Sequence, residues 1–343
     1  MTLRETLNDG YVSVVVFGPG YGESVAVRGP DGRWLVIDSL REPRSERNPA
    51  AALLREFDAE PELLVLTHDH EDHSAGFAEL VEMQSGSGTR IGCVPRVLPD
   101  AADPLRNPDA GAALRQGRTR LALAAIQAQW DRRPSSRWLL CRGRETTLGP
   151  VRITALSPRA ELVGAGVLRN RLSAAMLLEW EDLRVILGAD LPNVEWQRVD
   201  SRVDLGAHQL CKAPHHGSKR SQHDRLFNGT GTGATWIVAP WTRAGRHVPS
   251  LAGDGDLDRL LRRIPRVELT SSPTALTSWP TPPIDRAALS RLVDRSTFGG
   301  SDLVLEYDDA ERPAAESWVA ASLTSTGELA AIERGNSALP VDP

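Results

Sequence analysis

The sequence of 343 residues contains few cysteines, no long apolar run and no excess of positive charge. Its cysteines, Cys93, Cys141 and Cys211, are widely spaced and odd in number, which argues against a disulfide framework and favours a reducing compartment. No stretch suggests a transmembrane helix or a secretory signal. The net charge of −5 creates no general attraction for nucleic acid, although a local basic patch would suffice. We therefore expect a cytoplasmic globular protein that does not associate with a membrane.

The remaining composition, 41% hydrophobic and 25% charged, suits one large α/β domain. Hydrophobic patterning predicts strands over Val12–Phe17, Glu23–Arg28, Arg33–Asp38, Leu63–Leu66, Trp138–Cys141, Val151–Ser157, Ala174–Trp180, Arg184–Leu187, Gln209–Lys212, Trp236–Ala239 and Ser317–Leu323. A helix is predicted over Pro49–Phe57. We expect a single domain over residues 1–343, with a helical insertion at about 95–134, a C-terminal strand extension at about 285–337 and a frayed tail from Ala338.

One segment concentrates the chemistry of the chain. His68, His70 and His73 alternate with acidic residues directly after the apolar run Leu63–Leu66. The run predicts a buried strand, and the apolar spacing of Ser74–Val81 predicts a helix after it. The histidines would then lie on a strand-to-helix loop, at the edge of the sheet where α/β folds place their sites. A lone histidine is usually structural, but this cluster is typical of a site for zinc, manganese or iron.

Later strand ends can complete such a site. The cluster can serve two metal ions, each through two side chains: His68 with His70, and Asp72 with His73. Asp190 follows a predicted strand, and its two carboxylate oxygens can bridge the two cations. Either His215 or His216 can close the second site, and Gly217 lets the backbone turn sharply beside them.

This order of ligands resembles the metallo-β-lactamase superfamily. The resemblance lies in three motifs: His68-x-His70-x-Asp72-His73, the strand-end Asp190 and His216-Gly217. Within the superfamily, the chain looks most like the hydrolase domain of competence-type DNA-uptake proteins. That closer resemblance rests on Leu156-Ser157-Pro158, on Asn170 with Ser173, on Gly188-Ala189-Asp190, and on Ala213-Pro214-His215-His216-Gly217-Ser218 with Ser221. It covers roughly residues 12–250.

The resemblance implies an α/β fold, a four-layer αββα sandwich, with one or two divalent ions, zinc or manganese, at one rim. It implies that the first ion is held by His68 and His70, the second by Asp72, His73 and His216, with Asp190 between them. It also implies that Asp38 supports the histidine loop from behind. The chain departs from the family pattern, because no histidine occurs between His73 and His208. Asn170 or water would then complete the first site, and binding of a single ion at the second site stays open.

The resemblance further implies hydrolysis by a metal-ionised water, with Asp72 orienting that water. Basic residues gather in sequence around the histidine turn: Lys212, Lys219, Arg220, Arg225, Arg243 and Arg246. With the hydroxyls of Ser218 and Ser221 they suit phosphate, and His215 can contact a phosphoryl oxygen or protonate a leaving group. We therefore expect a phosphodiesterase acting on DNA or RNA. Two alternatives stay open: a metal-bound subunit of a multi-protein assembly with weak or partner-dependent activity, and a hydrolase of a small ester, lactone or thioester.

Overall fold

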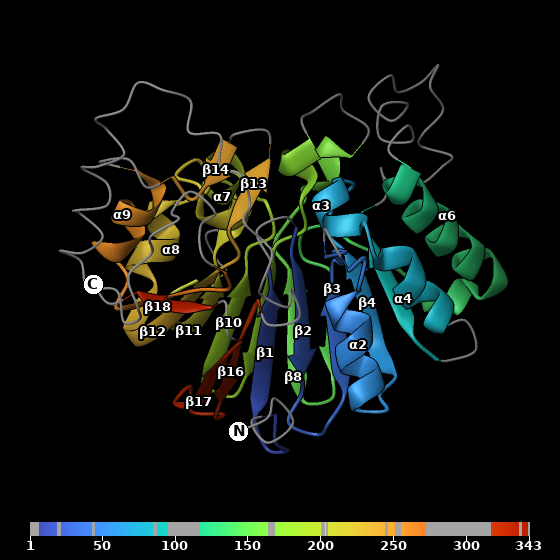
Figure 1. Ribbon diagram of the computed structural model, residues 1–343, viewed down its shortest axis with the longest axis horizontal. Coiled ribbons are helices and arrows are strands. Elements are labelled where there is room, and N and C mark those ends of the chain that lie inside the picture. Colours follow the sequence, from blue (N-terminus) through green and yellow to red (C-terminus); the bar gives the residue numbers. More distant parts are fainter. Residues whose placement is uncertain are drawn as a thin grey trace.

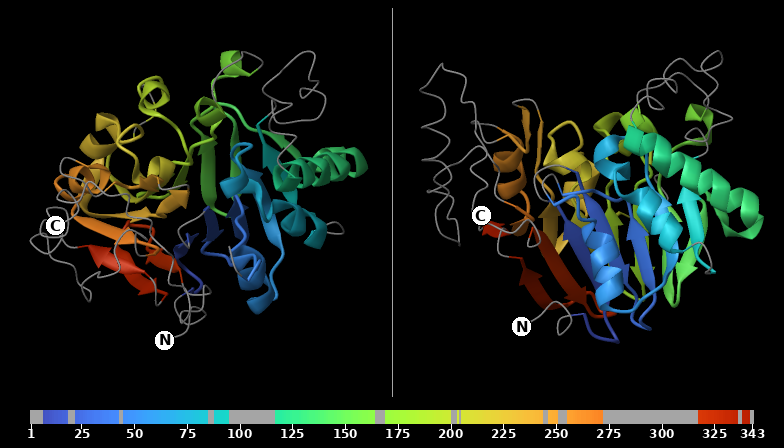
Figure 2. Two further views of the ribbon diagram at one scale, coloured as in Figure 1. Left: turned by 45° about the horizontal axis from the view of Figure 1, so that its top comes forward. Right: turned by 45° about the vertical axis from the view of Figure 1, so that its right-hand side comes forward.

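The computed structural model describes residues 7–18, 22–42, 45–84, 88–94, 117–163, 169–199, 203, 205–243, 246–250, 255–271, 317–335 and 338–341. Two large sheets face each other, and helices lie against their outer faces (Figures 1 and 2). This arrangement confirms the predicted α/β sandwich. No helix in the described part of the chain is long and apolar enough to cross a bilayer.

The first sheet carries the histidine loop. Within the described ranges it contains eight strands, in the order β17-β16-β1-β2-β3-β4-β5-β6. In chain order their bounds are β1 (Val12–Phe17), β2 (Ser24–Arg28), β3 (Trp34–Ile37), β4 (Pro61–Leu66), β5 (Arg90–Cys93), β6 (Arg137–Leu139), β16 (Trp318–Leu323) and β17 (Leu329–Arg334). Strand β4 pairs in parallel with both β3 and β5. It is covered on both faces, which explains its continuous apolar run.

The second sheet supplies the later strand ends. It also contains eight strands among the described residues, in the order β18-β15-β12-β11-β10-β9-β8-β7. Their bounds are β7 (Glu145–Leu148), β8 (Val151–Ala155), β9 (Met176–Trp180), β10 (Leu183–Leu187), β11 (His208–Lys212), β12 (Thr230–Val238), β15 (Arg266–Leu269) and β18 (Leu339–Val341). A separate two-stranded hairpin is formed by β13 (Trp241–Arg243) and β14 (Arg246–Val248). Strands β10, β11, β12 and β15 run parallel, so their carboxyl ends share one edge.

Helices on the two outer faces complete the four layers. Figure 1 shows α2 (Pro49–Glu56), α4 (Phe77–Met83) and α6 (Gly117–Arg132) on the side of the first sheet, and α8 (Asp224–Asn228) and α9 (Asp256–Leu261) on the side of the second. One apolar cluster fills the space between the sheets and under the first group of helices. A second cluster packs the other sheet against α8, α9 and the short α7 (Asn193–Trp196).

Several local predictions need correction. The helix predicted over Ser74–Val81 is two helices, α3 (Glu71–Ser74) and α4, because the chain breaks at Gly76. A Cβ on Gly76 would lie 2.5 Å from Ser39 Oγ, so the turn packs closely against the neighbouring loop. The tail predicted to fray instead pairs as β18 with β15, whose open edge it covers. Residues 95–116 and 285–316, parts of the predicted insertion and extension, lie outside the described residues.

Candidate metal centre

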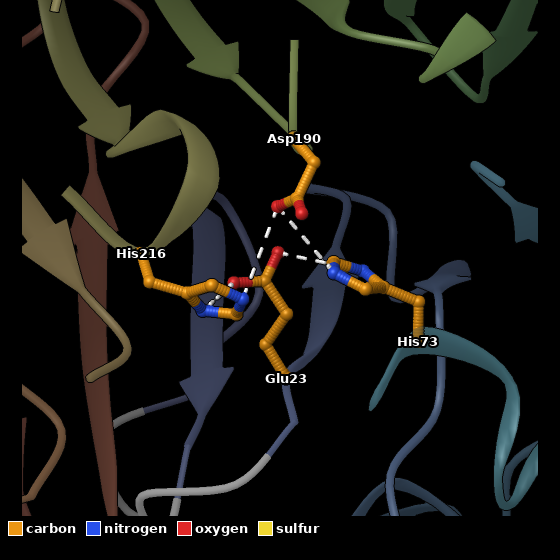
Figure 3. Close-up of side chains that lie close together, drawn as sticks. All are labelled: Glu23, His73, Asp190 and His216. Carbon is orange, nitrogen blue, oxygen red and sulfur yellow. Dashed lines mark ion pairs between the residues drawn. The ribbon is translucent and has the colours of Figure 1, made fainter. Parts of the chain in front are cut away.

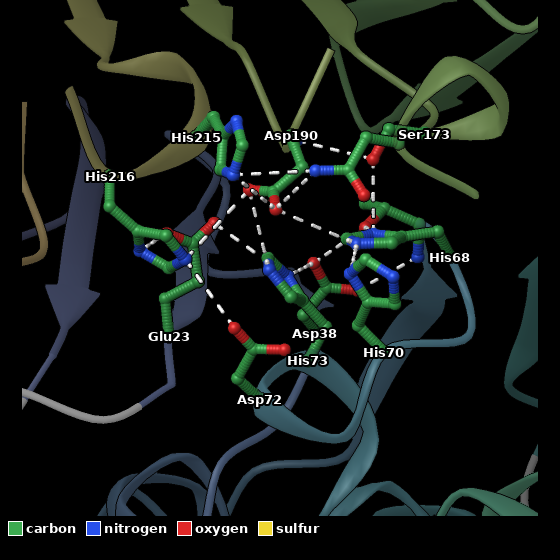
Figure 4. A network of polar contacts seen from close by, with 12 residues as sticks. Glu23, Asp38, His68, His70, Asp72, His73, Ser173, Asp190, His215 and His216 are labelled. Atoms are coloured by element: carbon green, nitrogen blue, oxygen red, sulfur yellow. Dashed lines mark hydrogen bonds and ion pairs between the residues drawn. The ribbon is translucent and has the colours of Figure 1, made fainter. Parts of the chain in front are cut away.

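The predicted ligands meet at one end of the sandwich, at the top of Figure 1. The histidine segment follows β4, Asp190 follows β10, and His216 follows β11 on the short 3₁₀ turn Pro214–Gly217. The structure therefore brings together loops from both sheets that are more than a hundred residues apart in sequence. Figure 4 shows their side chains directed into one polar network.

Asp38 anchors the histidine loop from the end of β3. Its Oδ1 accepts a hydrogen bond from the Thr67 amide at 2.7 Å, and its Oδ2 accepts one from the Thr67 hydroxyl at 2.7 Å. His73 Nδ1 also donates to Oδ2, at 2.7 Å. This contact leaves His73 Nε2 directed toward the other ligands. Asp38 has a left-handed φ of 56°, an uncommon conformation for a residue other than glycine and typical of functional sites.

His216 is held on the opposite side of the centre. Its Nδ1 donates to the Ala239 carbonyl at 3.0 Å, and its ring stacks against Trp241 with centroids 6.1 Å apart. Its Nε2 lies 3.5 Å from Asp72 Oδ2 and 3.9 Å from Asp190 Oδ1. His216 also has a left-handed φ, of 55°, so the backbone bends sharply to present this ring.

These contacts define what we call the second half of the centre: Asp72, His73, Asp190 and His216. His73 Nε2 lies 3.4 Å from Asp190 Oδ1 (Figure 3). Three of the converging atoms, His73 Nε2, His216 Nε2 and Asp190 Oδ1, are buried and have no hydrogen-bond partner. Leaving buried polar atoms unpaired is costly. His73, His216 and Asp190 fall with Glu23 in one group whose ligand atoms lie within 4.8 Å of one another, and Asp72 Oδ2 adjoins His216 Nε2. Two imidazole nitrogens beside carboxylates are a donor set that suits a divalent ion, so the residues fit the ion that the sequence predicts.

The first half of the centre comprises His68, His70 and one oxygen of Asp190. His68 Nε2 lies 3.1 Å from His70 Nδ1 and 3.7 Å from Asp190 Oδ2. His68 Nδ1 contacts two hydroxyls, those of Thr67 and Ser173, each at 3.0 Å. Asp190 thus offers one oxygen to each half, as expected of a bridging carboxylate.

Asn170 lies at the edge of the first half. Its Nδ2 donates to Asp190 Oδ2 at 3.3 Å and lies 3.3 Å from His215 Nε2. As placed, the amide orients Asp190 and His215 through its nitrogen, whereas a role as a metal ligand would require its oxygen.

The two halves differ in electrostatics. Burial lowers the pKa of His68 well below its usual value, with help from the neighbouring His73 and His70. For His73, burial also lowers the pKa, but Asp190, Asp38 and Glu23 outweigh it and raise the pKa well above its usual value. His216 behaves in the same way, and Glu23 and Asp190 raise its pKa to about 9 against the effect of burial. The second half therefore favours positive charge strongly.

The two carboxylates of the second half stay ionised. Burial alone raises the pKa of Asp72, but the hydrogen bond with His216 and the charge of His73 outweigh it and hold the pKa below its usual range. Burial likewise raises the pKa of Asp190, and the neighbouring histidines lower it well below its usual value. Both carboxylates are therefore available as ligands at neutral pH.

Sequence reasoning missed Glu23, which directly precedes β2 and is buried beneath the centre. Its carboxylate contacts His216 Nδ1 at 3.2 Å and forms an ion pair with Lys212. Lys212 was expected in an exposed basic patch, and the structure overturns this, because its side chain is buried. The only available signal was an acidic residue at a strand start after a glycine turn, and such residues are common.

The residues predicted to bind phosphate lie on the turn after His216. Lys219 and Arg220 are exposed, and no acidic side chain among the described residues pairs with either one. Ser218 and Ser221 are buried, and Ser221 Oγ lies 3.5 Å from His215 Nδ1. Their positions suit bracing of the turn, and direct contact of these two serines with substrate stays a prediction.

Of the two histidines on the turn after β11, His215 is more exposed to solvent than His216. Its side chain is 30% exposed, compared with 2% for the adjacent His216. Its Nε2 lies 3.7 Å from Asp190 Oδ2, and burial lowers its pKa. His215 therefore lies at the edge of the centre, and its lowered pKa favours the neutral imidazole.

Comparison with known proteins agrees with this geometry. Residues 17–84 match the family model described as the metallo-beta-lactamase superfamily. This match supports membership in the metallo-β-lactamase superfamily. The matched segment includes Glu23, Asp38 and the whole histidine cluster. Together, the match and the ligand clusters support a metal-dependent hydrolase. Among curated proteins, none matches the chain.

Three solved structures are similar to this chain at low identity. CmlA, a diiron β-hydroxylase from Streptomyces venezuelae, is 19% identical over 60% of this chain and 34% of its own, with a TM-score of 0.35. YhfI, a metallo-β-lactamase-fold protein from Bacillus subtilis, is 15% identical over 66% of this chain and 86% of its own, with a TM-score of 0.35. The Rm3 metallo-β-lactamase is 16% identical over 65% of this chain and 85% of its own, with a TM-score of 0.36. The chain thus spans about one third of CmlA, and no substrate follows from these similarities.

Proposed function

We propose that the protein is a metal-dependent phosphodiesterase that cleaves DNA or RNA. The hydrolase part of this proposal is carried by one observation. Ligand atoms from both sheets, His73 Nε2, His216 Nε2 and Asp190 Oδ1, converge while buried and unpaired. A divalent ion bound there would lower the pKa of a coordinated water toward neutrality and so supply a nucleophile.

Exposed positive charge at the rim of the centre favours a phosphate-bearing substrate. Lys219 and Arg220 follow the histidine turn by only a few residues and are exposed. Their backbone carbonyls accept hydrogen bonds from Asn193, at 2.9 Å for Lys219 and 2.7 Å for Arg220. These bonds attach the turn to the loop that follows Asp190. The two cations are therefore fixed beside the centre, where a phosphodiester backbone would pass.

A second group of cations flanks the same loop. Arg159, Arg171 and Arg198 converge on the buried carboxylate of Glu195, at 3.2, 2.6 and 3.5 Å. Among the described residues, three guanidinium groups share this one acid, which leaves an excess of positive charge there. Arg171 is adjacent in sequence to Asn170, which contacts Asp190. An extended substrate with several phosphates would match this arrangement better than a small neutral ester would.

The residues around the centre have separable tasks in this proposal. Asp72 is ionised, and one of its oxygens faces His216, so the carboxylate can orient the attacking water as well as bind. Neutral His215 can contact a phosphoryl oxygen through Nε2. Lys219 and Arg220 hold the neighbouring phosphates. The closer resemblance to competence-type hydrolase domains is part of this proposal, and so is nucleic acid as the partner.

The test is metal-dependent cleavage of single- and double-stranded oligonucleotides by purified protein. Asp72→Ala and Asp190→Ala should each abolish cleavage, because each removes a carboxylate from the centre. Lys219→Glu with Arg220→Glu should weaken substrate binding and flatten its dependence on salt, because fewer counterions are released.

A matched control reverses two cations away from the centre, Arg33→Glu with Arg55→Glu, and should leave the salt dependence unchanged. Full activity in both aspartate variants would exclude this centre. Cleavage of small esters but of no oligonucleotide would exclude the phosphodiesterase and leave the ester hydrolase.

A further inference from the structure

A buried ion pair joins the two sheets beneath the candidate centre. The side chains of Glu23 and Lys212 are 2% and 1% exposed, and Lys212 Nζ donates to Glu23 Oε1. Glu23 stands at the start of β2 in the first sheet, and Lys212 ends β11 in the second. Burying two charges is expensive, and such a pair adds little stability compared with apolar residues of the same size. The position of this ion pair directly beneath the candidate metal centre indicates that it acts on the metal ligands.

Glu23 belongs to the same buried group of acids and histidines as His73, Asp190 and His216, but it lies at the Nδ1 edges of the two rings. Its two oxygens approach Nδ1 atoms, that of His216 at 3.2 Å and that of His73 at 3.7 Å. Asp190 Oδ1 approaches the opposite, Nε2 atoms of the same two rings. Figure 3 shows the Glu23 carboxylate between the two rings, with the Asp190 carboxylate above it. Glu23 can therefore orient both rings at their Nδ1 edges while an ion is held at Nε2.

One further contact ties Glu23 to the second half. Its backbone amide donates to the Asp72 carbonyl at 3.0 Å, which fixes the position of that ligand. The cavity beside the ion pair, lined by Glu23, Asp38, Thr67 and Lys212, has room for roughly one water molecule. No substrate fits there, so the pair can act on the ligands only.

We propose that Glu23 is a positioning residue that orients His216 and sets the metal affinity of the second half. Lys212 is its counter-ion and keeps the carboxylate ionised in a buried position before an ion binds. The pair also holds His73 of the first sheet and His216 of the second in register. The first half has no equivalent, because His68 is supported by the hydroxyls of Thr67 and Ser173.

The test is a competition titration of metal-free protein with Zn²⁺ against a chromophoric chelator. Glu23→Gln should weaken the tighter Zn²⁺ site by about 10- to 100-fold, the usual effect of removing a supporting carboxylate. Ser173→Ala removes a hydroxyl that contacts His68 and accepts a hydrogen bond from the Asp190 backbone amide, and it should weaken that tighter site less than Glu23→Gln does. The visible spectrum of the Co²⁺-loaded protein should also change in Glu23→Gln, because the orientation of His216 changes.

Glu23→Gln leaves Lys212 buried without a counter-ion, so the double variant Glu23→Gln with Lys212→Met is measured beside it. Removing both charges restores a neutral interior, and the double variant should fold and show the same loss of Zn²⁺ affinity. Wild-type affinity in the double variant would overturn the proposal. An equal loss in Ser173→Ala would also overturn it, because the effect would then be a general loosening of the centre.

Discussion

The two halves of the centre use the same kinds of ligand but support them differently. In the first half, hydroxyl groups of Thr67 and Ser173 hold His68, and burial lowers its pKa. In the second half, the carboxylates of Asp38 and Glu23 lie behind His73 and His216. There the nearby acids outweigh burial and raise both pKa values. A pocket that stabilises a proton also stabilises a divalent cation, so the second half should bind metal first.

The halves also differ in how they are assembled. Both imidazoles of the first half come from one short segment, His68–His70. The second half takes His73 from the first sheet, and Asp190 and His216 from the second. Because both halves share Asp190, both join the two sheets, but only the second half takes an imidazole from each sheet, so it depends more on their correct packing.

The largest expected effect on metal content comes from removing one imidazole from each half. This tests whether the second half binds metal more tightly than the first. His73→Ala should abolish binding of the tighter ion, a greater loss than the ~10–100-fold attributed to a supporting residue. His70→Ala should leave that ion in place, because His70 belongs to the first half. Metal content after dialysis, measured by elemental analysis, distinguishes them. The ranking fails if His70→Ala loses the tighter ion and His73→Ala keeps it.

The first half could be predicted from sequence because its signal is local. The apolar run of β4 followed by closely spaced histidines identifies both the strand and the loop. Asp190 and His216 could be predicted as well, since each follows a buried parallel strand and stands in a recognisable motif. The sandwich itself follows from the pattern of the strands and from the family resemblance.

The supporting residues could not be predicted, because their signal is spatial. Glu23 and Lys212 are 189 positions apart in sequence, and each alone looks like a solvated charge. Strand β5 was missed for a related reason: Gly92 weakens the strand pattern. That glycine is needed because Trp138 packs against it, and a Cβ there would lie 2.7 Å from the Trp138 ring. The tail strand β18 depends on β15, which the sequence pattern also did not reveal.

Removal of one support from each half gives an intermediate effect. Asp38→Asn should lower the affinity for the more tightly bound ion by about 10- to 100-fold, because the hydrogen bond that orients His73 is lost. Ser173→Ala should weaken binding of that ion less, since Ser173 contacts the backbone amide of Asp190 and not its carboxylate. Zn²⁺ titration measures both, and thermal unfolding of the metal-free variants shows whether the fold is kept. Equal losses would mean that the halves are supported alike.

The pH dependence of metal affinity distinguishes the two halves without any substitution. Near neutral pH the metal-free His216 carries a proton, because Glu23 and Asp190 outweigh burial and raise its pKa to about 9. His73 is protonated as well, because nearby acids outweigh burial and raise its pKa. An incoming ion must displace both protons, so affinity at the second half should rise by up to about a hundredfold per pH unit from neutral pH until these pKa values are passed. The first half should show no such rise over this range, because the pKa of His68 is already lowered. Calorimetry in buffers of different ionisation enthalpy counts the released protons, and release of none would contradict the assignment.

The most direct test of the central claim is the position of the first ion. Crystals grown with one equivalent of Zn²⁺ per chain would be measured at the zinc absorption edge for anomalous scattering. The account predicts one strong peak between His73 Nε2, His216 Nε2 and Asp190 Oδ1, with Glu23 at the Nδ1 edges of the rings. A single peak between His68 and His70 would contradict it.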